Sequence, residues 1–261
     1  MSAVLYSEVK GKGKDVVLLH GWGMHGGLWG RFSDLLAEDF HCHVIDLPGF
    51  GYSKDLENDF TLESMSKDIE DYLSNLNQDV TVIGWSLGGL ITLNLLKRKK
   101  VALNKIVLIA STPKFTKDKN SHWLSAMEQK EFDDFARELK NDYKKTLKRF
   151  LSLQVRGSDL ARDDLRLLNQ KLSERGEPGI VALQNGLKIL SETDLRNVSD
   201  PAVPVMTVLG EKDTLVPPGV KSEFKKMFSC LEQLVVEKTG HAPFISRPEI
   251  CADKIKNFIN E

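Results

Sequence analysis

Short apolar runs alternate with segments of helical periodicity along most of this chain. Runs rich in β-branched residues predict buried strands at 15–19, 43–46, 80–83, 105–110, 203–209 and 231–236, and the weaker alternation of 4–9 suits an edge strand. Apolar positions spaced by three and four predict helices over 28–40, 62–76, 219–227 and 248–259, with Thr61 as an N-cap, and one more after residue 86. Such alternation indicates an α/β fold, with helices on both faces of a mostly parallel sheet.

The segment 112–190 has a different character. It shows no strand-like run, only charged helical patterns that break at 157–158 and 176–179. It carries 16 Lys and Arg against 12 Asp and Glu, a net charge of +4, whereas the whole chain has a net charge of −1. We therefore expect a core built from 1–111 and 191–261, with 112–190 inserted as a helical cap.

The stretch 80–90 carries the most specific chemical signal. It reads Val-Thr-Val-Ile-Gly-Trp-Ser-Leu-Gly-Gly-Leu, which places a G-x-S-x-G motif between a predicted strand and a predicted helix. The bare motif often occurs by chance as a glycine-rich turn with an incidental serine. In this context it predicts a nucleophile elbow, in which a sharp turn exposes the Ser86 hydroxyl at the carboxyl edge of the sheet.

Two further strand ends supply the partners that a serine nucleophile needs. Asp213 follows the predicted strand 203–209, and His241 follows the strand 231–236, which gives the chain order Ser, Asp, His of this elbow architecture. The Gly-rich loop 20–23 follows an early strand, so we expect the backbone N–H groups of Trp22 and Leu87 to form an oxyanion hole. For His20 we expect a local hydrogen bond that shapes this loop rather than a role as base.

Composition adds several expected absences. No apolar run approaches the ~20 residues that span a bilayer, and the first residues lack a signal-peptide pattern. Cys42, Cys230 and Cys251 show no metal-ligand spacing and suit reduced thiols of a cytoplasmic protein. We expect a monomer without a metal or cofactor, and no binding to nucleic acid or membranes.

The basic residues of the predicted cap include two pairs spaced by four. Lys145 with Arg149, and Arg162 with Arg166, each lie on one helical face. These faces are either solvated surfaces or a docking site for an acidic partner. The apolar residues 150, 151, 153 and 155 that interleave with them either line a pocket or form the core of the cap.

Five stretches of the sequence carry a resemblance to a known family: 20–23, 46–51, 84–89, 210–213 and 240–244. Together they resemble the α/β-hydrolase superfamily over nearly the whole chain. More narrowly, the sequence is similar to the BioH family of pimeloyl-[acyl-carrier protein] methyl ester carboxylesterases. Three features carry this similarity: the Trp before Ser86, the sequence His-Ala-Pro-Phe-Ile-Ser after Gly240, and the cap segment 149–154.

This resemblance implies roles residue by residue. It implies Ser86 as nucleophile, His241 as base and Asp213 as its orienting partner, with Trp22 and Leu87 at the oxyanion hole and substrate slot. The implied contacts to the pimeloyl chain are Phe150, Leu151, Ser152, Leu153 and Gln154. The implied contacts to an acyl carrier protein are Lys145, Arg149, Arg162 and Arg166, although the family pattern has Arg at the position of Lys145, and Lys lacks the bidentate fork of Arg.

The resemblance therefore implies hydrolysis of the methyl ester of pimeloyl-[acyl-carrier protein] in biotin synthesis, with methanol as the other product. Alternatives are a broad short-chain carboxylesterase, a thioesterase or carbon–carbon hydrolase with the same triad, and a ligand-binding protein that keeps the fold. A pure binding protein does not need all three members of a triad.

Overall fold

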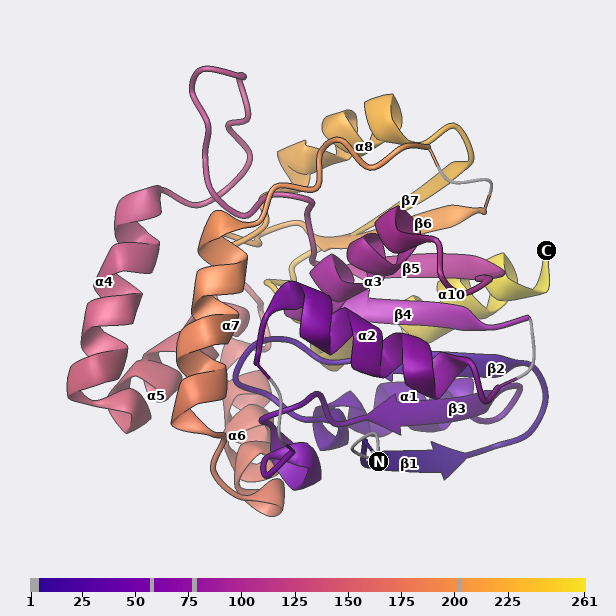
Figure 1. The fold of residues 1–261 in the computed structure, drawn as a ribbon, viewed down its shortest axis with the longest axis horizontal. Helices are drawn as coiled ribbons and strands as arrows, with labels where there is room; N and C mark the ends of the chain where they lie inside the picture. Colours follow the sequence, from indigo (N-terminus) through magenta and orange to yellow (C-terminus); the bar gives the residue numbers. More distant parts are fainter. Residues whose placement is uncertain (1–4, 57–58, 77–78, 201–202) are drawn as a thin grey trace.

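The computed structural model describes residues 5–56, 59–76, 79–200 and 203–261. Figure 1 shows one central sheet with helices on both sides and a group of helices at one end. The strands are β1 (Ser7–Lys10), β2 (Asp15–Leu19), β3 (His41–Ile45), β4 (Thr81–Trp85), β5 (Lys105–Ile109), β6 (Val205–Gly210) and β7 (Leu231–Val236). The α-helices are α1 (Gly30–Leu36), α2 (Leu62–Leu73), α3 (Leu87–Arg98), α4 (Gln129–Asn141), α5 (Tyr143–Gln154), α6 (Ala161–Leu172), α7 (Ile180–Glu192), α8 (Lys221–Met227), α9 (Pro243–Ser246) and α10 (Pro248–Asn260).

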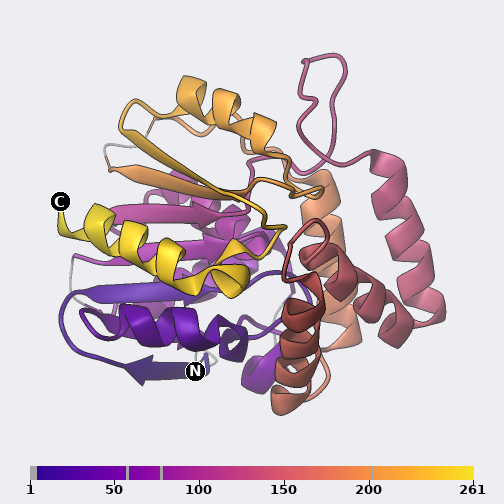
Figure 2. The ribbon, with the colours of Figure 1, turned by 180° about the vertical axis from the view of Figure 1, so that it is seen from behind.

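The strands are ordered β1-β3-β2-β4-β5-β6-β7, and only the β1–β3 pair is antiparallel. Strands β2, β4, β5 and β6 are buried along their whole length, as expected of parallel strands that helices cover on both faces. Helices α2 and α3 cover one face (Figure 1), and α1 and α10 cover the other (Figure 2). The predicted α/β architecture is confirmed.

Local signals predicted most element boundaries to within a few residues. Thr61 caps α2 as expected, because its hydroxyl accepts from the Ser64 N–H and the Ser64 hydroxyl accepts from the Thr61 N–H. The predicted helix 28–40 is instead a 3₁₀ turn, Gly26–Trp29, followed by the shorter α1. Gly30, the first residue of α1, has a φ of +39°, and this conformation interrupts the helical path between the two elements.

The helices α4 to α7 come between β5 and β6 and lie together beyond the carboxyl ends of the parallel strands (Figures 1 and 2). We refer to α4–α7 as the cap helices. The expectation of a purely helical pattern over 112–190 is wrong for its first part. Residues 112–128 form a protruding loop with two isolated bridges, Thr116 to Met127 and Asp118 to Trp123. The Asp118 carboxylate accepts from the N–H groups of Asn120 and Ser121, so a tight turn replaces a helix there.

A buried arginine joins the cap helices to the core. Arg175 lies between α6 and α7, and its guanidinium forms an ion pair of 2.9 Å with the buried Asp46 and another with Glu8. The guanidinium also lies 5.2 Å from the ring centre of Tyr6 and 5.3 Å from that of Tyr52. Arg175 therefore fixes the far end of the cap against β1 and the loop after β3, a contact that the sequence pattern did not indicate.

Candidate active site

The segment predicted as a nucleophile elbow has a strand, a sharp turn and a helix, as its sequence predicted. Ser86 stands between β4 and α3 with φ +54° and ψ −112°, a strained conformation for a residue with a side chain. A Cβ on Gly84 would lie 2.4 Å from the Gly88 carbonyl oxygen, and one on Gly88 would lie 2.1 Å from the Leu19 carbonyl oxygen. The two glycines of the motif are therefore required for strand, turn and helix to approach this closely.

Neighbouring strands hold the strained serine in place. The Ser86 N–H donates to the Ile109 carbonyl over 3.0 Å, and the Ser111 hydroxyl donates to the Ser86 carbonyl over 2.8 Å. Both partners come from β5 or the residues directly after it. The hydroxyl of Ser86 is thus positioned by rigid elements, which is what a reacting group needs.

Asp213 and His241 form a buried pair at the ends of β6 and β7. His241 Nδ1 lies 2.8 Å from Asp213 Oδ2, and the exposed fractions of the two side chains are 1% and 0%. Asp213 Oδ1 accepts from the N–H groups of Leu215 and Val216, which fixes the carboxylate. Asp213 therefore holds the histidine with Nδ1 as donor and leaves Nε2 to face the cavity.

The backbone of His241 is held from two directions. Its N–H donates to the carbonyl of Gln154 at the end of α5, and its carbonyl accepts from the indole N–H of Trp85 over 2.9 Å. Trp85 thus links β4, the strand before Ser86, to the loop that carries His241. The cap contributes to the same support through Gln154.

Ser86 and His241 line one narrow, apolar cavity of about 10 Å³, room for a single water molecule. Among the described residues, His241 Nε2 has no hydrogen-bond partner, so the Ser86 hydroxyl does not donate to it in this structure. Such hydrogen bonds often form only when substrate is bound. The remaining lining residues are Phe115, Met127, Phe132, Phe135, Phe150, Leu187, Leu190 and Leu215.

The loop predicted to supply the oxyanion hole lies against Ser86. A Cβ on Gly21 would be 3.3 Å from the Ser86 Cβ. The Trp22 indole donates to the Leu183 carbonyl over 2.8 Å, and its ring meets Phe150 edge-on with 4.7 Å between ring centres. Leu87 is the first residue of α3. The role of the Trp22 and Leu87 N–H groups stays a prediction.

His20 shapes this loop, as the sequence suggested. It is fully buried, its Nδ1 lies 2.8 Å from the Gly21 carbonyl, and its Nε2 accepts from the Leu47 N–H over 3.0 Å. Burial lowers the pKa of His20 to about 4, so the ring is neutral at physiological pH. Both ring nitrogens are used, which leaves none to act as a base.

Of the five residues that the resemblance assigned to the acyl chain, the structure brings only Phe150 to the cavity. Leu151 lines a different cleft, Ser152 is exposed, and Leu153 packs against the core. Gln154 is buried beside His241. Most of the lining comes from α4, α7 and the loop 112–128, which the sequence pattern did not indicate. The aromatic residues at 132 and 135 on α4 were the available signal.

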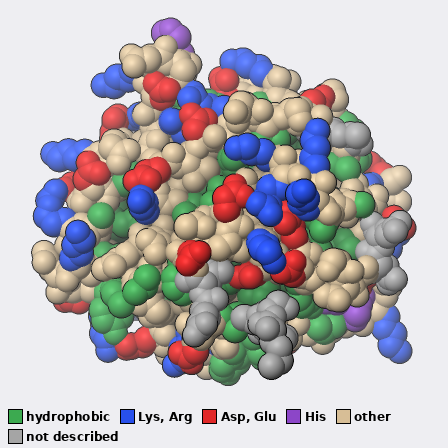
Figure 3. All heavy atoms as spheres, in the orientation of Figure 1, with side chains coloured by type: hydrophobic (Ala, Val, Ile, Leu, Met, Phe, Trp, Pro, Cys, Tyr) green, Lys and Arg blue, Asp and Glu red, His purple; other side chains and the backbone are tan. Residues whose placement is uncertain are grey.

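The four predicted docking cations are all exposed. Arg149 forms an ion pair with Glu138 of α4 and lies over the Phe135 ring. Within the described part of the chain, Lys145, Arg162 and Arg166 form no ion pair. Figure 3 shows Lys and Arg side chains interspersed with acidic ones over the face it presents, so the positive charge there is not one continuous patch.

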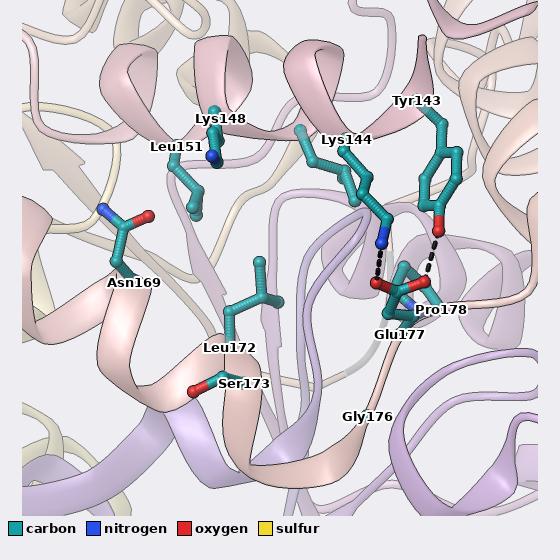
Figure 4. A pocket seen from close by; sticks show the side chains of 11 residues that line it. Tyr143, Lys144, Lys148, Leu151, Asn169, Leu172, Ser173, Gly176, Glu177 and Pro178 are labelled. Atoms are coloured by element: carbon teal, nitrogen blue, oxygen red, sulfur yellow. Dashed lines mark hydrogen bonds and ion pairs between the residues drawn. The ribbon is translucent and has the colours of Figure 1, made fainter.

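A larger cleft of about 410 Å³ opens between α5 and α6. Figure 4 shows Lys148 and Leu151 on α5 facing Asn169 and Leu172 on α6, with Lys144 and Tyr143 bonded to Glu177. We refer to this as the outer cleft. Leu147 also lines it, and a Cβ on Gly23 would lie 2.9 Å from the Leu147 side chain. Leu147 therefore separates the outer cleft from the loop beside Ser86.

One group of potential metal ligands lies outside this site. The sequence indicated no ligand cluster, but Asp15, His41 and His43 offer ligand atoms that all lie within 4.8 Å of one another. The spacing His-X-His on a strand was the available signal, and only the pairing of β2 with β3 adds the carboxylate. The catalytic cavity itself is lined by no such cluster among the described residues.

The comparisons with known proteins agree with this geometry. A family model described as the alpha/beta hydrolase fold matches residues 15–248. This chain belongs to the α/β-hydrolase family. The predicted superfamily is therefore confirmed over almost the whole chain.

Curated relatives of this α/β hydrolase are named pimeloyl-[acyl-carrier protein] methyl ester esterase. The one from Photobacterium profundum is 35% identical over 260 residues, which cover 99% of this chain and 100% of the relative. The one from Aeromonas hydrophila is 36% identical over 251 residues, 95% of this chain and 96% of the relative. These relatives place the α/β hydrolase among the carboxylic ester hydrolases of its family.

Solved structures show the same fold at lower identity. An esterase from Exiguobacterium antarcticum superposes with a TM-score of 0.89 at 22% identity and covers 98% of this chain and 96% of that one. A bromoperoxidase from Bacillus anthracis gives 0.90 at 20%, covering 98% and 95%. At this identity the likeness concerns the fold alone. No helix in the described part of the α/β hydrolase is both long and apolar enough to cross a membrane.

Proposed function

We propose that this α/β hydrolase cleaves the methyl ester of a pimeloyl group carried on acyl carrier protein. The observation that carries the reaction type is the buried His241–Asp213 pair, 2.8 Å apart, beside Ser86 in one cavity. Among the described residues, His241 Nε2 has no hydrogen-bond partner, so it is available to accept a proton. The substrate is carried over from the curated relatives, which share 33–36% identity over nearly the full length. We also propose that the protein acts in the cytoplasm as a monomer.

In the proposed reaction, His241 Nε2 accepts the proton of the Ser86 hydroxyl as its oxygen attacks the ester carbonyl carbon. The N–H groups of Trp22 and Leu87 stabilise the resulting oxyanion, an effect of about 10²- to 10³-fold per donor in related chemistry. His241 returns the proton to the leaving methoxide, and methanol departs. Water then attacks the acyl-enzyme by the same route and releases the carboxylate.

The apolar lining suits the methylene chain of the acyl group. Phe150, Phe135 and Met127 come from the cap helices and the loop before them, so their positions set the size of the cavity. Because its volume is about 10 Å³, an acyl chain must displace some of these side chains or move the cap when it binds.

The outer cleft offers a route for the arm that joins the acyl chain to its carrier. Lys144 and Lys148 line it, and further exposed cations lie elsewhere on α5 and α6. Carrier proteins of this class are acidic, so these cations would steer and orient the carrier. The arm would then pass along the outer cleft and displace Leu147 to reach Ser86.

The direct test compares kcat/KM for pimeloyl-[acyl-carrier protein] methyl ester with that for p-nitrophenyl acetate. We expect a strong preference for the carrier-bound ester that weakens as salt rises, because exposed charges are screened. Equal rates on both substrates, unchanged by salt, would show a generalist esterase instead.

Charge reversal on α6 tests the docking of the carrier. In the double variant Arg162→Glu, Arg166→Glu we expect kcat/KM on the carrier-bound ester to fall by about 10- to 100-fold at low salt. Neither side chain forms an ion pair within the described structure, so the melting temperature should change little.

The matched control is Lys12→Glu, Lys14→Glu, which makes the same change in net charge on an exposed turn of the core. It should leave both substrates unaffected. A similar loss in the control, or an equal loss on p-nitrophenyl acetate, would remove the docking role of α6.

Filling the outer cleft tests the route of the arm. Leu172→Trp adds a large side chain to the cleft wall, so we expect kcat/KM on the carrier-bound ester to fall by about tenfold or more, a cost of at least ~1.4 kcal/mol. Hydrolysis of p-nitrophenyl acetate should persist. Leu167→Trp on the same helix is the control, because Leu167 is exposed and does not line the cleft. Full activity of Leu172→Trp on the carrier-bound ester would exclude this route.

The small cavity supports a second candidate, a carboxylesterase for short acyl groups. The free space beside Ser86 is about 10 Å³, so an acetyl group requires less displacement of the cap side chains than a pimeloyl group does. The substrate comparison separates the two, because a short-chain esterase gains nothing from the carrier.

A further inference from the structure

Three titratable side chains converge at the end of the sheet opposite Ser86. Asp15 begins β2 and His41 begins β3, and the parallel register pairs the two residues. His43 lies two positions further along β3 and therefore faces the same side of the sheet. One carboxylate oxygen, Asp15 Oδ1, lies 2.8 Å from His41 Nδ1 and 3.0 Å from His43 Nε2.

The hydrogen bonds around His43 favour one of its two neutral tautomers. The Tyr72 hydroxyl donates to the Ser7 hydroxyl over 3.0 Å, so the Tyr72 oxygen accepts from the group on its other side. That group is His43 Nδ1, 2.9 Å away. A neutral His43 thus has its proton on Nδ1 and directs the lone pair of Nε2 at the Asp15 carboxylate.

The contact between His43 Nε2 and Asp15 Oδ1 is 3.0 Å long and lies in a buried site. His43 and Asp15 have side-chain exposures of only 4% and 5%, so water does not separate these atoms. A proton or a metal ion can bridge two such atoms. Two imidazole nitrogens with one carboxylate oxygen form a ligand set typical of Zn²⁺.

We propose that Asp15, His41 and His43 form a binding site for a divalent metal ion of the zinc class, with water as the fourth ligand. Tetrahedral coordination at Zn–N and Zn–O distances of about 2.0–2.1 Å places ligand atoms about 3.3 Å apart, so the two contacts must open by about 0.3–0.5 Å. His41, with 37% of its side chain exposed, has room for this shift and gives the ion a path from solvent.

Tyr72 supports the site from outside the ligand set. By accepting from Nδ1 of His43 it orients the ring and keeps Nε2 available, as outer hydrogen bonds commonly do for metal-binding histidines. Tyr72 belongs to α2 and its partner Ser7 to β1, so a bound ion would tie together β1, β2, β3 and α2. The site lies at the amino ends of the strands, so we assign it to stability rather than to hydrolysis at Ser86.

Metal binding to the untagged, EDTA-treated protein tests this proposal. We expect calorimetry to detect one equivalent of Zn²⁺, and Co²⁺ to give the visible absorption of a tetrahedral site. A 100-fold excess of Zn²⁺ over its Kd should raise the melting temperature by about 5 °C. Hydrolysis of p-nitrophenyl acetate by the EDTA-treated protein should be unchanged.

Variants identify the ligands. His41→Gln removes a ligand at a partly exposed position, and we expect Kd to rise by more than 100-fold, beyond the ~10–100-fold that loss of an outer partner costs. Tyr72→Phe should raise Kd by about tenfold. His122→Gln is the matched control, because His122 is exposed on the loop 112–128 and should not contribute. The exposed Cys230 is present in all variants, so differences among them report on this cluster.

Equal binding by His41→Gln and His122→Gln would overturn the proposal, as would absence of tight binding by the native chain. A proton would then bridge His43 and Asp15, and the three residues would form a hydrogen-bonded cluster. The test of the metal site does not depend on the proposed esterase function, because it measures metal affinity, absorption and melting temperature rather than hydrolysis.

Discussion

Replacing Ser86 by alanine is expected to lower kcat/KM for ester hydrolysis by about 10⁴- to 10⁶-fold. The reason is that no other hydroxyl lines the cavity that His241 Nε2 faces, according to the described residues. The backbone should be unaffected, because the hydrogen bonds that hold residue 86 use its N–H and carbonyl, not its side chain. The measurement is steady-state hydrolysis of p-nitrophenyl acetate, with the melting temperature as a check on folding.

Ser222→Ala is the matched control for this variant. Ser222 is exposed on α8, and its hydroxyl bonds only locally, to the Gly219 carbonyl. It should retain full activity. If Ser86→Ala keeps more than a few per cent of the native rate, a nucleophile other than Ser86 performs the reaction and the proposed mechanism fails.

Replacing Asp213 by asparagine is expected to lower kcat by about 10⁴-fold. The structure supplies the reason. Asp213 Oδ1 accepts from two backbone N–H groups, so an Asn side chain must direct its oxygen there and its NH₂ group toward His241. His241 Nδ1 then becomes an acceptor, its proton moves to Nε2, and Nε2 can no longer take the proton of Ser86.

The control for this change is Asp200→Asn. Asp200 also accepts from a backbone N–H, that of Ser229, but is exposed and far along the chain from the histidine loop. It should leave kcat unchanged. A loss of less than tenfold in Asp213→Asn would mean that the orientation of His241 does not depend on this carboxylate.

That Ser86, Asp213 and His241 lie at one edge of the sheet was predictable, because each of them follows a strand. In a parallel sheet, carboxyl ends of successive strands meet at one edge, so residues after 80–83, 203–209 and 231–236 were expected to converge there. The elbow adds a local constraint, since only glycine fits at 84 and 88. His20 was also interpreted correctly, because its loop offered local partners.

The sequence did not predict which cap residues line the cavity beside Ser86, for a different physical reason. On an amphipathic helix the pattern identifies the buried face, but it does not say whether that face meets another helix or a cavity. Phe150 and Leu151 are neighbours on α5, yet Phe150 reaches the cavity beside Ser86 and Leu151 reaches the outer cleft. The packing of α4, α5 and α7 against one another decides which side chain reaches which cavity, and local sequence patterns do not predict this packing.

The sequence by itself determined the α/β class, the order of most elements and the three residues of the candidate catalytic site, because strand periodicity and turn chemistry are local properties. Only the tertiary structure decided which cap residues line the cavity and that Arg175 fixes the cap to Asp46. It also joined Asp15 to His41 and His43, which are separated by 26 and 28 positions. These contacts depend on strand register and helix packing, in which residues far apart in the chain are brought together by the burial of surfaces elsewhere.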